Sequence, residues 1–180
     1  IWSFYFARRG NYLLAGALGG ISTATRIVGL ALIPALVLEA RKGGKKDIFR
    51  KTMGVLLIPV GLFVYMYFLK TKTGDPLEFF NTISIFGEQR GSELILLPQV
   101  FYRYLFKILP NLNYSSFPIV FTTGLEIATA TIFFVLAIIS FVKIRLSYAV
   151  YFLIAYLIPT FSGSFSSFPR YAVILFPAFI

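Results

Sequence analysis

Two arginines in this sequence each lie between a hydroxyl-rich stretch and an apolar run. Arg26 falls within ISTATRIVGLALIP, and Arg170 falls within SGSFSSFPRYAVILFP. Because a guanidinium binds phosphate oxygens through paired N–H groups, two of them at one place would hold a phosphate group. Two alternatives stay open. Arg26 extends to the lipid headgroups along its own aliphatic stem, and Arg170 anchors a helix end at the membrane interface.

Carboxylates concentrate in one part of the chain. Four of the seven acidic residues lie between positions 70 and 117: Asp75, Glu78, Glu88 and Glu93. A carboxylate there is able to orient a sugar hydroxyl or to act as a general base; the alternative is ordinary solvation of a surface helix. The sequence has no histidine and no cysteine, which excludes disulfides, imidazole catalysis and the usual zinc sites. These residues predict no cofactor and no metal site.

The elements that carry these residues are predicted to be membrane helices. Of the 180 residues, 58% are hydrophobic and only 13% are charged, whereas soluble domains have about 25% charged residues. Several apolar runs approach the roughly 20 residues that cross a bilayer. The net charge of +10 comes from basic clusters in short loops, a pattern of membrane orientation rather than of nucleic-acid binding. We therefore expect an all-α, polytopic transmembrane bundle.

Basic clusters also predict the orientation. The stretch EARKGGKKDIFRK, residues 39–51, has six basic residues against two acids, which places it in the cytoplasm. Arg8-Arg9 and Lys143/Arg145 are the other cytoplasmic markers. Crossings are then expected over 53–69, 118–142, 147–161 and from Tyr171 onward. In this topology 70–117 is an outer segment of a single transmembrane domain that spans residues 1–180.

The same markers require residues 11–40 to cross an even number of times. We expect a hairpin of two short helices, 11–23 and 27–40, that bends at residues 24–26. Each arm would reach only about 20 Å, so Arg26 at the tip would lie beside a wet cavity near the outer interface. Small residues in the first arm permit close helix packing: Gly16, Gly19 and Gly20.

The outer segment is predicted to begin with an interfacial helix. Gly74-Asp75-Pro76 is a typical turn and helix start. Apolar residues then recur at helical spacing, which suits a helix lying in the interface plane: Leu77, Phe79, Phe80, Ile83 and Phe86. A second amphipathic piece, QVFYRYLFKIL, follows over residues 99–109.

With these residues in hand, the chain resembles the GT-C class of membrane glycosyltransferases, and most of all the PIG-V-like mannosyltransferases. Three stretches carry the resemblance: ALGGISTATRIVGLALIPALVLEARK, GDPLEFFNTISIFGEQ and FSSFPRYAVILFPAFI. They are similar to the family's Thr-Arg corner, its outer Gly-x-Pro-Leu-x-Phe segment and its late Pro-Arg-Tyr stretch. One departure is Ile27, where many relatives have proline after the Thr-Arg pair; Gly29 is expected to compensate.

The resemblance implies an enzyme that moves a hexose, expected to be mannose, from a polyprenyl-phosphate donor to a lipid or protein acceptor at the outer membrane face. Arg26 and Arg170 are expected to contact the donor phosphate or the acceptor headgroup. Gln89, with Glu88 beside it, and Tyr171 complete the expected substrate-binding set. The chain begins at Ile1 and stops within an apolar run, so we expect a fragment that lacks the family's catalytic carboxylate, and a divalent metal in that missing part stays open.

Two other function classes remain. A transporter or flippase of lipid-linked sugars would use a broken helix at residues 24–26 as its substrate site, and a structural membrane subunit would have no chemistry of its own. The expected location is a prokaryotic plasma membrane, with the endoplasmic reticulum membrane as the alternative. Membrane lipids are the expected surroundings, and nucleic acid is not an expected partner.

Overall fold

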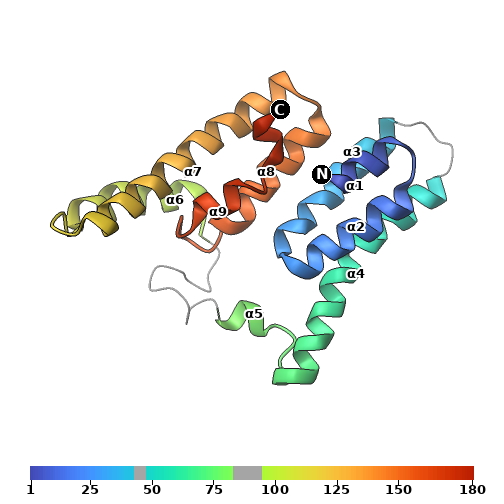
Figure 1. The fold of residues 1–180 in the computed structure, drawn as a ribbon, viewed down its shortest axis with the longest axis horizontal. Coiled ribbons are helices and arrows are strands. Elements are labelled where there is room, and N and C mark those ends of the chain that lie inside the picture. Colours follow the sequence, from blue (N-terminus) through green and yellow to red (C-terminus); the bar gives the residue numbers. More distant parts are fainter. Residues whose placement is uncertain (43–47, 83–94) are drawn as a thin grey trace.

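A computed structural model describes residues 1–42, 48–82 and 95–180, and these residues form helices with no β-strand among them (Figure 1). The α-helices are α1 Trp2–Arg8, α2 Tyr12–Thr25, α3 Leu32–Lys42, α4 Ile48–Thr73, α5 Glu78–Asn81, α6 Leu97–Tyr102, α7 Phe117–Lys143, α8 Leu146–Thr160 and α9 Phe168–Ala172. Shorter helical turns are the 3₁₀-helices η1 Ile27–Ala31, η4 Leu109–Asn111 and η5 Phe176–Phe179, and the π-helix η3 Arg103–Ile108. The all-α prediction is confirmed for the described residues.

Among the described residues, two helices are long and apolar enough to cross a membrane. Helices α4 and α7 have 26 and 27 residues, which at 1.5 Å per residue gives about 39 and 40 Å, more than the roughly 30 Å hydrocarbon core. Only 11% and 22% of their most apolar windows are buried, so these side chains face outward and do not form a protein core. The length and the exposed apolar surface of α4 and α7 indicate that the protein associates with a membrane.

The predicted boundaries of these helices lie close to the observed ones. Predicted spans 53–69 and 118–142 correspond to α4 and α7, and 147–161 corresponds to α8. Helix α8 has 15 residues and is therefore only about 22 Å long. It packs between α7 on one side and α3 with η1 on the other, and it buries Ala149, Phe152, Ala155 and Tyr156. Its main role in the fold is that of a core helix.

Glycines bring α2 and α4 into backbone contact. A methyl group added at Gly16 would collide with the carbonyl oxygen of Gly54, and one at Gly61 would collide with the carbonyl oxygen of Gly20. The Thr23 Oγ1 hydroxyl donates across the same interface to the carbonyl oxygen of Ile58 at 2.5 Å. The predicted close packing of the glycine face is confirmed, and its partner is α4.

The predicted hairpin is confirmed in its break and its two arms. Helix α2 ends at Thr25, Arg26 has an extended backbone (φ −150°, ψ 132°), and η1 begins at the next residue. A Cβ at Gly29 would lie 2.7 Å from the backbone nitrogen of Thr23. Gly29 therefore allows η1 to fold back on the end of α2, as expected for a corner without proline.

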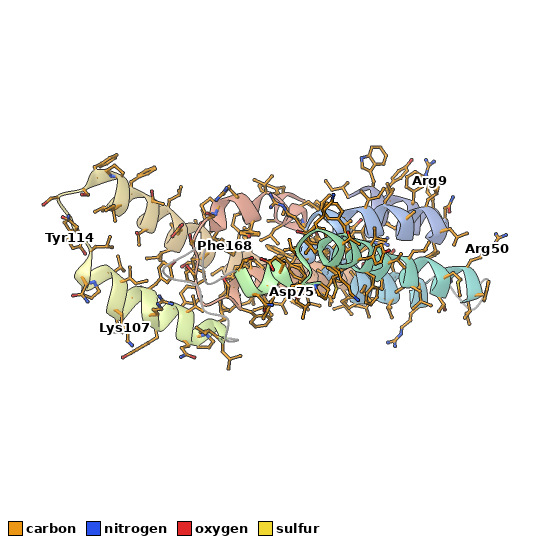
Figure 2. The ribbon with its side chains drawn as sticks, turned by 90° about the horizontal axis from the view of Figure 1, so that it is seen from below. Arg9, Arg50, Asp75, Lys107, Tyr114 and Phe168 are labelled. Carbon is orange, nitrogen blue, oxygen red and sulfur yellow. The ribbon has the colours of Figure 1, made fainter. Side chains whose placement is uncertain are left out.

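The outer segment begins with the predicted turn and helix start. The Asp75 carboxylate accepts from the Leu77 N–H (2.8 Å) and from the Asn81 side chain (2.6 Å), and helix α5 covers Glu78–Asn81. Ile83 and Phe86 lie outside the described residues. The second predicted piece, residues 99–109, lies within one run of helical turns over residues 97–111. This run extends past Lys107 toward Tyr114, at the end opposite to Arg9 and Arg50 (Figure 2).

Candidate functional site

A cavity of about 300 Å³ lies at the break between α2 and η1. One wall comes from α2 and η1, and the other comes from α8 and from the stretch that contains α9. Its lining residues are Ser22, Thr25, Arg26, Val28, Gly29, Tyr151, Arg170, Val173 and Ile174. The fold thus brings together the two arginines that the sequence singled out, although they lie at opposite ends of the chain.

Arg26 reaches this cavity because α2 stops directly before it. Its backbone N–H still donates to the carbonyl oxygen of Ser22 at 2.9 Å, which closes the last helical turn, while its extended backbone turns the side chain away from α2. The guanidinium carbon lies 5.7 Å from the centre of the Tyr171 ring. At an exposed site such a cation–π contact is worth about 0.5–1 kcal/mol, so it orients Arg26 toward α9 with little effect on stability.

Arg170 is held in place by the loop before α9. Its Nη2 donates to the Ser167 hydroxyl at 2.5 Å, and Ser167 itself has a left-handed backbone (φ 62°). The backbone N–H of Ser167 donates to the Glu126 carboxylate at 2.7 Å. Since Glu126 lies within α7 and is only 8% exposed, α7 fixes the position of the loop and hence of Arg170.

The sequence placed Arg170 just before an apolar helix, and this was wrong. Arg170 lies in the last turn of α9, which has only five residues. Helix α9 ends at Ala172, and Pro177 lies in the first turn of the next helical element, where its missing N–H costs no hydrogen bond. The apolar run instead continues as η5. Tyr171 follows Arg170 and contacts Arg26 through its ring face.

The charge of the cavity is positive. None of its lining residues is acidic, and among residues 1–42, 48–82 and 95–180 the carboxylate ion pairs involve neither Arg26 nor Arg170. Hydroxyls of Ser22, Thr25 and Tyr151 complete the polar lining. Two guanidinium groups with neighbouring hydroxyls are suited to bind an anion with several oxygens, such as a phosphate.

Two expected substrate-binding residues, Glu88 and Gln89, lie outside the described residues. Three others, Arg26, Arg170 and Tyr171, are gathered at or beside the cavity. Within the described ranges no group of three or more acidic residues gathers that could hold a metal ion. The polar groups that the cavity itself supplies are guanidinium and hydroxyl groups.

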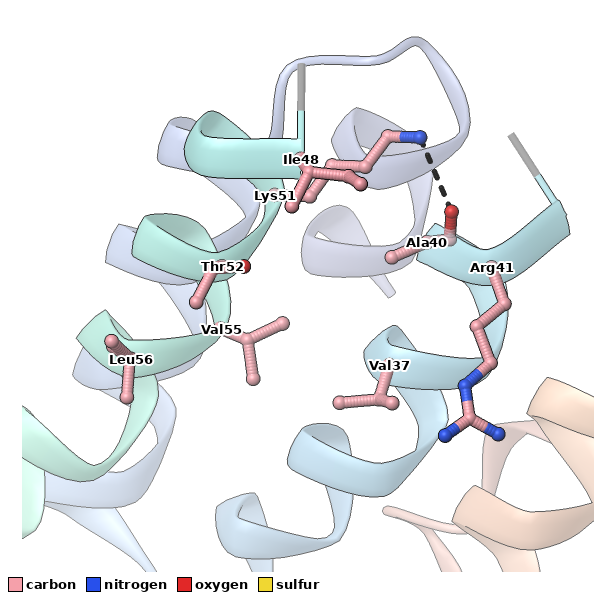
Figure 3. A pocket seen from close by; sticks show the side chains of 8 residues that line it. All are labelled: Val37, Ala40, Arg41, Ile48, Lys51, Thr52, Val55 and Leu56. Atoms are coloured by element: carbon pink, nitrogen blue, oxygen red, sulfur yellow. Dashed lines mark hydrogen bonds between the residues drawn. The ribbon is translucent and has the colours of Figure 1, made fainter. Parts of the chain in front are cut away.

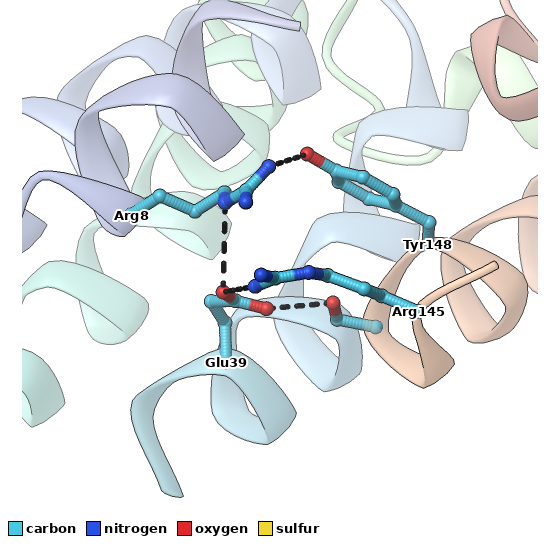
Figure 4. A network of polar contacts seen from close by, with 5 residues as sticks. Arg8, Glu39, Arg145 and Tyr148 are labelled. Atoms are coloured by element: carbon cyan, nitrogen blue, oxygen red, sulfur yellow. Dashed lines mark hydrogen bonds and ion pairs between the residues drawn. The ribbon is translucent and has the colours of Figure 1, made fainter. Parts of the chain in front are cut away.

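A second polar cluster, absent from the sequence analysis, surrounds Glu39 (Figure 4). The Glu39 side chain is 8% exposed and pairs with Arg8 (Nε–Oε1 4.0 Å) and with Arg145 (Nη1–Oε1 3.4 Å). Its second oxygen accepts from the Ser147 hydroxyl at 2.7 Å. Arg8 also donates to the Tyr148 hydroxyl at 3.0 Å. One carboxylate therefore joins α1, α3 and the start of α8.

This cluster bears on the predicted orientation. Arg8, Glu39 and Arg145 come from the three stretches that were assigned to the cytoplasmic side, and the structure brings these three side chains together. The other buried acid, Glu126, which holds the loop before α9, did have a signal in the sequence. Glu126 is the only acidic residue in the predicted span 118–142, and an ionisable residue within an apolar run is expected to have a specific partner.

Comparisons of the chain with protein-family models, with curated proteins and with solved structures gave no match. The resemblance to the GT-C class therefore depends on the sequence motifs alone.

Proposed function

We propose that this chain belongs to a multi-pass membrane glycosyltransferase that moves a hexose, expected to be mannose, from a polyprenyl-phosphate donor to a lipid or protein acceptor. The observation that supports the proposal most is the convergence of Arg26 and Arg170 on one cavity without a carboxylate in its lining. The same proposal places the cavity at the outer membrane face, because the basic residues around Glu39 are assigned to the cytoplasmic side.

The chemistry requires a positive site for the leaving group. An acceptor oxygen forms a bond to the anomeric carbon, the bond from that carbon to the phosphate oxygen breaks, and both electrons leave with the phosphate. The phosphate thereby gains a further negative charge, while a base takes the proton of the acceptor. Fixed guanidinium groups stabilise such a developing charge, and Arg26 and Arg170 are the residues proposed for this role.

The cavity also explains why a broken helix would serve this reaction. In one continuous helix from Tyr12 to Lys42, the Arg26 side chain would lie on the side of the helix. The break after Thr25 instead turns Arg26 toward Tyr171 on α9, so that groups from distant parts of the chain face one ligand. Positioning of both substrates by groups from different elements is what a transfer between two lipid-borne molecules needs.

The test is an assay of sugar transfer by the full-length protein in liposomes that contain polyprenyl-phosphate mannose and a lipid acceptor. Loss of one group that stabilises charge in the transition state lowers kcat by about 10²–10³-fold. We expect such a loss for Arg26→Gln and for Arg170→Gln. Arg9→Gln is the matched control, since Arg9 does not line this cavity. Unfolding temperatures in detergent establish that the variants are folded; full transfer activity in both folded arginine variants would refute the assignment.

One observation favours the second candidate, a flippase of lipid-linked sugars. Helix α2 is interrupted at the cavity, and substrate sites in many transporters lie at interrupted helices. The same liposomes separate the two functions. Movement of the labelled lipid to the opposite leaflet without a transferred sugar would support the flippase and would exclude the enzyme.

A further inference from the structure

Three consecutive backbone N–H groups in the loop between α8 and α9 donate to side-chain oxygens. They are those of Phe165 to the Tyr104 hydroxyl (3.0 Å), Ser166 to the Ser164 hydroxyl (3.0 Å) and Ser167 to the Glu126 carboxylate (2.7 Å). Backbone N–H groups that no helix or sheet satisfies need such partners when they leave water. Side chains of η3 and α7 thus fix the loop that leads directly into α9 and Arg170.

Tyr104 supplies a buried hydroxyl to this loop. It lies in the π-helix η3, a rare form of turn that is frequent at functional sites, and it is only 1% exposed. Its hydroxyl shares a second hydrogen bond with the Ser164 hydroxyl (3.0 Å), and its ring centre lies 4.9 Å from that of Phe165. Burial raises the pKa of Tyr104 above its ordinary value, so the hydroxyl remains protonated and neutral. Tyr104 therefore holds the loop by packing and by hydrogen bonds.

The loop ends at the residue that holds Arg170. Ser167 has a left-handed backbone (φ 62°), which a residue other than glycine adopts only when its surroundings keep it there. Its hydroxyl accepts from Nη2 of Arg170. A segment held at one point can still rotate about that point, so the contacts of Tyr104 and Glu126 together define where Ser167 lies.

We infer that Tyr104 is a positioning residue of the phosphate site: with Glu126, it keeps the loop between α8 and α9 in the conformation that directs Arg170 to the cavity. The inference rests on the phosphate-binding role that the proposed function gives to Arg26 and Arg170. Tyr104 itself does not line the cavity. It raises the affinity for phosphate because a guanidinium that is already ordered loses less conformational entropy on binding.

The test is equilibrium binding of radiolabelled decaprenyl phosphate to the purified full-length protein in detergent. Decaprenol, which has the same chain and no phosphate, is the matched uncharged probe. Tyr104→Phe keeps the ring and removes only the hydroxyl. We expect it to weaken binding of decaprenyl phosphate about fivefold, equivalent to about 1 kcal/mol for the ordering of one long side chain, and to leave binding of decaprenol unchanged. Arg170→Gln removes the guanidinium itself and should weaken phosphate binding by about tenfold or more.

A double variant separates positioning from a general structural role. If Tyr104 acts through Arg170, Tyr104→Phe should have no further effect on phosphate affinity in a protein that already carries Arg170→Gln. A merely structural role would instead give the same loss in both backgrounds. Ser164→Ala removes the other hydroxyl of the shared hydrogen bond and should reproduce the effects of Tyr104→Phe. It takes the place of Tyr104→Phe if that variant does not fold.

Two control variants lose a buried hydrogen bond elsewhere in the fold. Tyr156→Phe removes the hydroxyl that donates to the Ala130 carbonyl oxygen at 3.0 Å. Lys51→Met removes the ammonium that donates from α4 to the Ala40 carbonyl oxygen of α3 at 3.2 Å (Figure 3). Neither Tyr156 nor Lys51 lines the cavity, so both variants should lower the unfolding temperature, as Tyr104→Phe does, without a change in phosphate affinity.

The outcomes distinguish this inference from the proposed function. If Arg170→Gln weakens phosphate binding and folded Tyr104→Phe does not, or if Tyr104→Phe gives equal losses in both backgrounds, the positioning role is overturned and the phosphate site stands. Absence of binding by the wild-type protein would overturn both. The expected set of affinities in a protein that transfers no sugar would support the positioning role and refute the glycosyltransferase.

Discussion

The glycine contacts between α2 and α4 predict opposite effects for two chemically identical substitutions. Gly61→Ala adds a methyl group that collides with the Gly20 carbonyl oxygen and lies 2.6 Å from the Thr23 hydroxyl. Gly124→Ala adds the same methyl group within α7, where no heavy atom lies within 4 Å. Both sites are in the interior of a long helix, so the change in helix propensity is the same and only the contacts differ.

The expected magnitude follows from three contributions. Overpacking costs about 1–3 kcal/mol, and the upper value applies because the obstacle is the α2 backbone, which has no rotamer to change. Separation of the helices also breaks the hydrogen bond from Thr23 to Ile58, which is worth about 1 kcal/mol. Alanine in place of glycine returns about 1 kcal/mol of helix propensity. Gly61→Ala should therefore lose about 3 kcal/mol of unfolding free energy, and Gly124→Ala should gain up to about 1 kcal/mol.

The assay is reversible unfolding in mixed detergent–SDS micelles, followed by circular dichroism, with the two variants and the wild-type protein side by side. Because α2 carries Arg26 at its end, we also expect Gly61→Ala to lower sugar transfer and Gly124→Ala to preserve it. Equal stability of the two variants would refute the backbone contact between α2 and α4 and the argument built on it.

Two further predictions concern buried polar groups. Glu39→Gln removes the charge shared by Arg8 and Arg145. Because these arginines are 42% and 50% exposed, we expect the unfolding free energy to fall by about 1–3 kcal/mol, less than the usual 3–5 kcal/mol for a fully buried pair. The same unfolding assay measures this loss, with Glu78→Gln as a near-neutral control. Tyr156→Phe removes the 3.0 Å hydrogen bond to the Ala130 carbonyl oxygen and should lose about 1 kcal/mol, whereas Tyr67→Phe, at a side chain that is 70% exposed, should lose none.

The pattern of apolar and charged residues along the sequence predicted the individual helices. Helices α4, α7 and α8 were predicted within five residues at each end, because long apolar runs bounded by charges leave few alternatives. The break at Arg26 followed from the count of basic markers. The convergence of Arg26 with Arg170 was stated as a hypothesis, and the shared cavity agrees with it.

Contacts between residues far apart in the chain could not be predicted from the sequence. The glycines of α2 indicated close packing, but their partners Gly54 and Gly61 are known only from the fold. The Glu39 cluster joins residues more than 100 positions apart, and no local spacing encodes such a contact. The end of α9 at Ala172 lies inside an uninterrupted apolar run, so the pattern of apolar residues did not indicate it.

The ion pairs at Glu39 have a mechanical consequence for the cavity. They fasten α3 to the start of α8 through Arg145 and Ser147. Tyr151 is the residue of α8 that lines the cavity, and it lies only four residues beyond Ser147, about 6 Å along the helix axis. A tilt of α8 by about 5° about its fastened start would displace this part of the wall by only about 0.5 Å. The shared carboxylate therefore braces the α8 wall of the cavity.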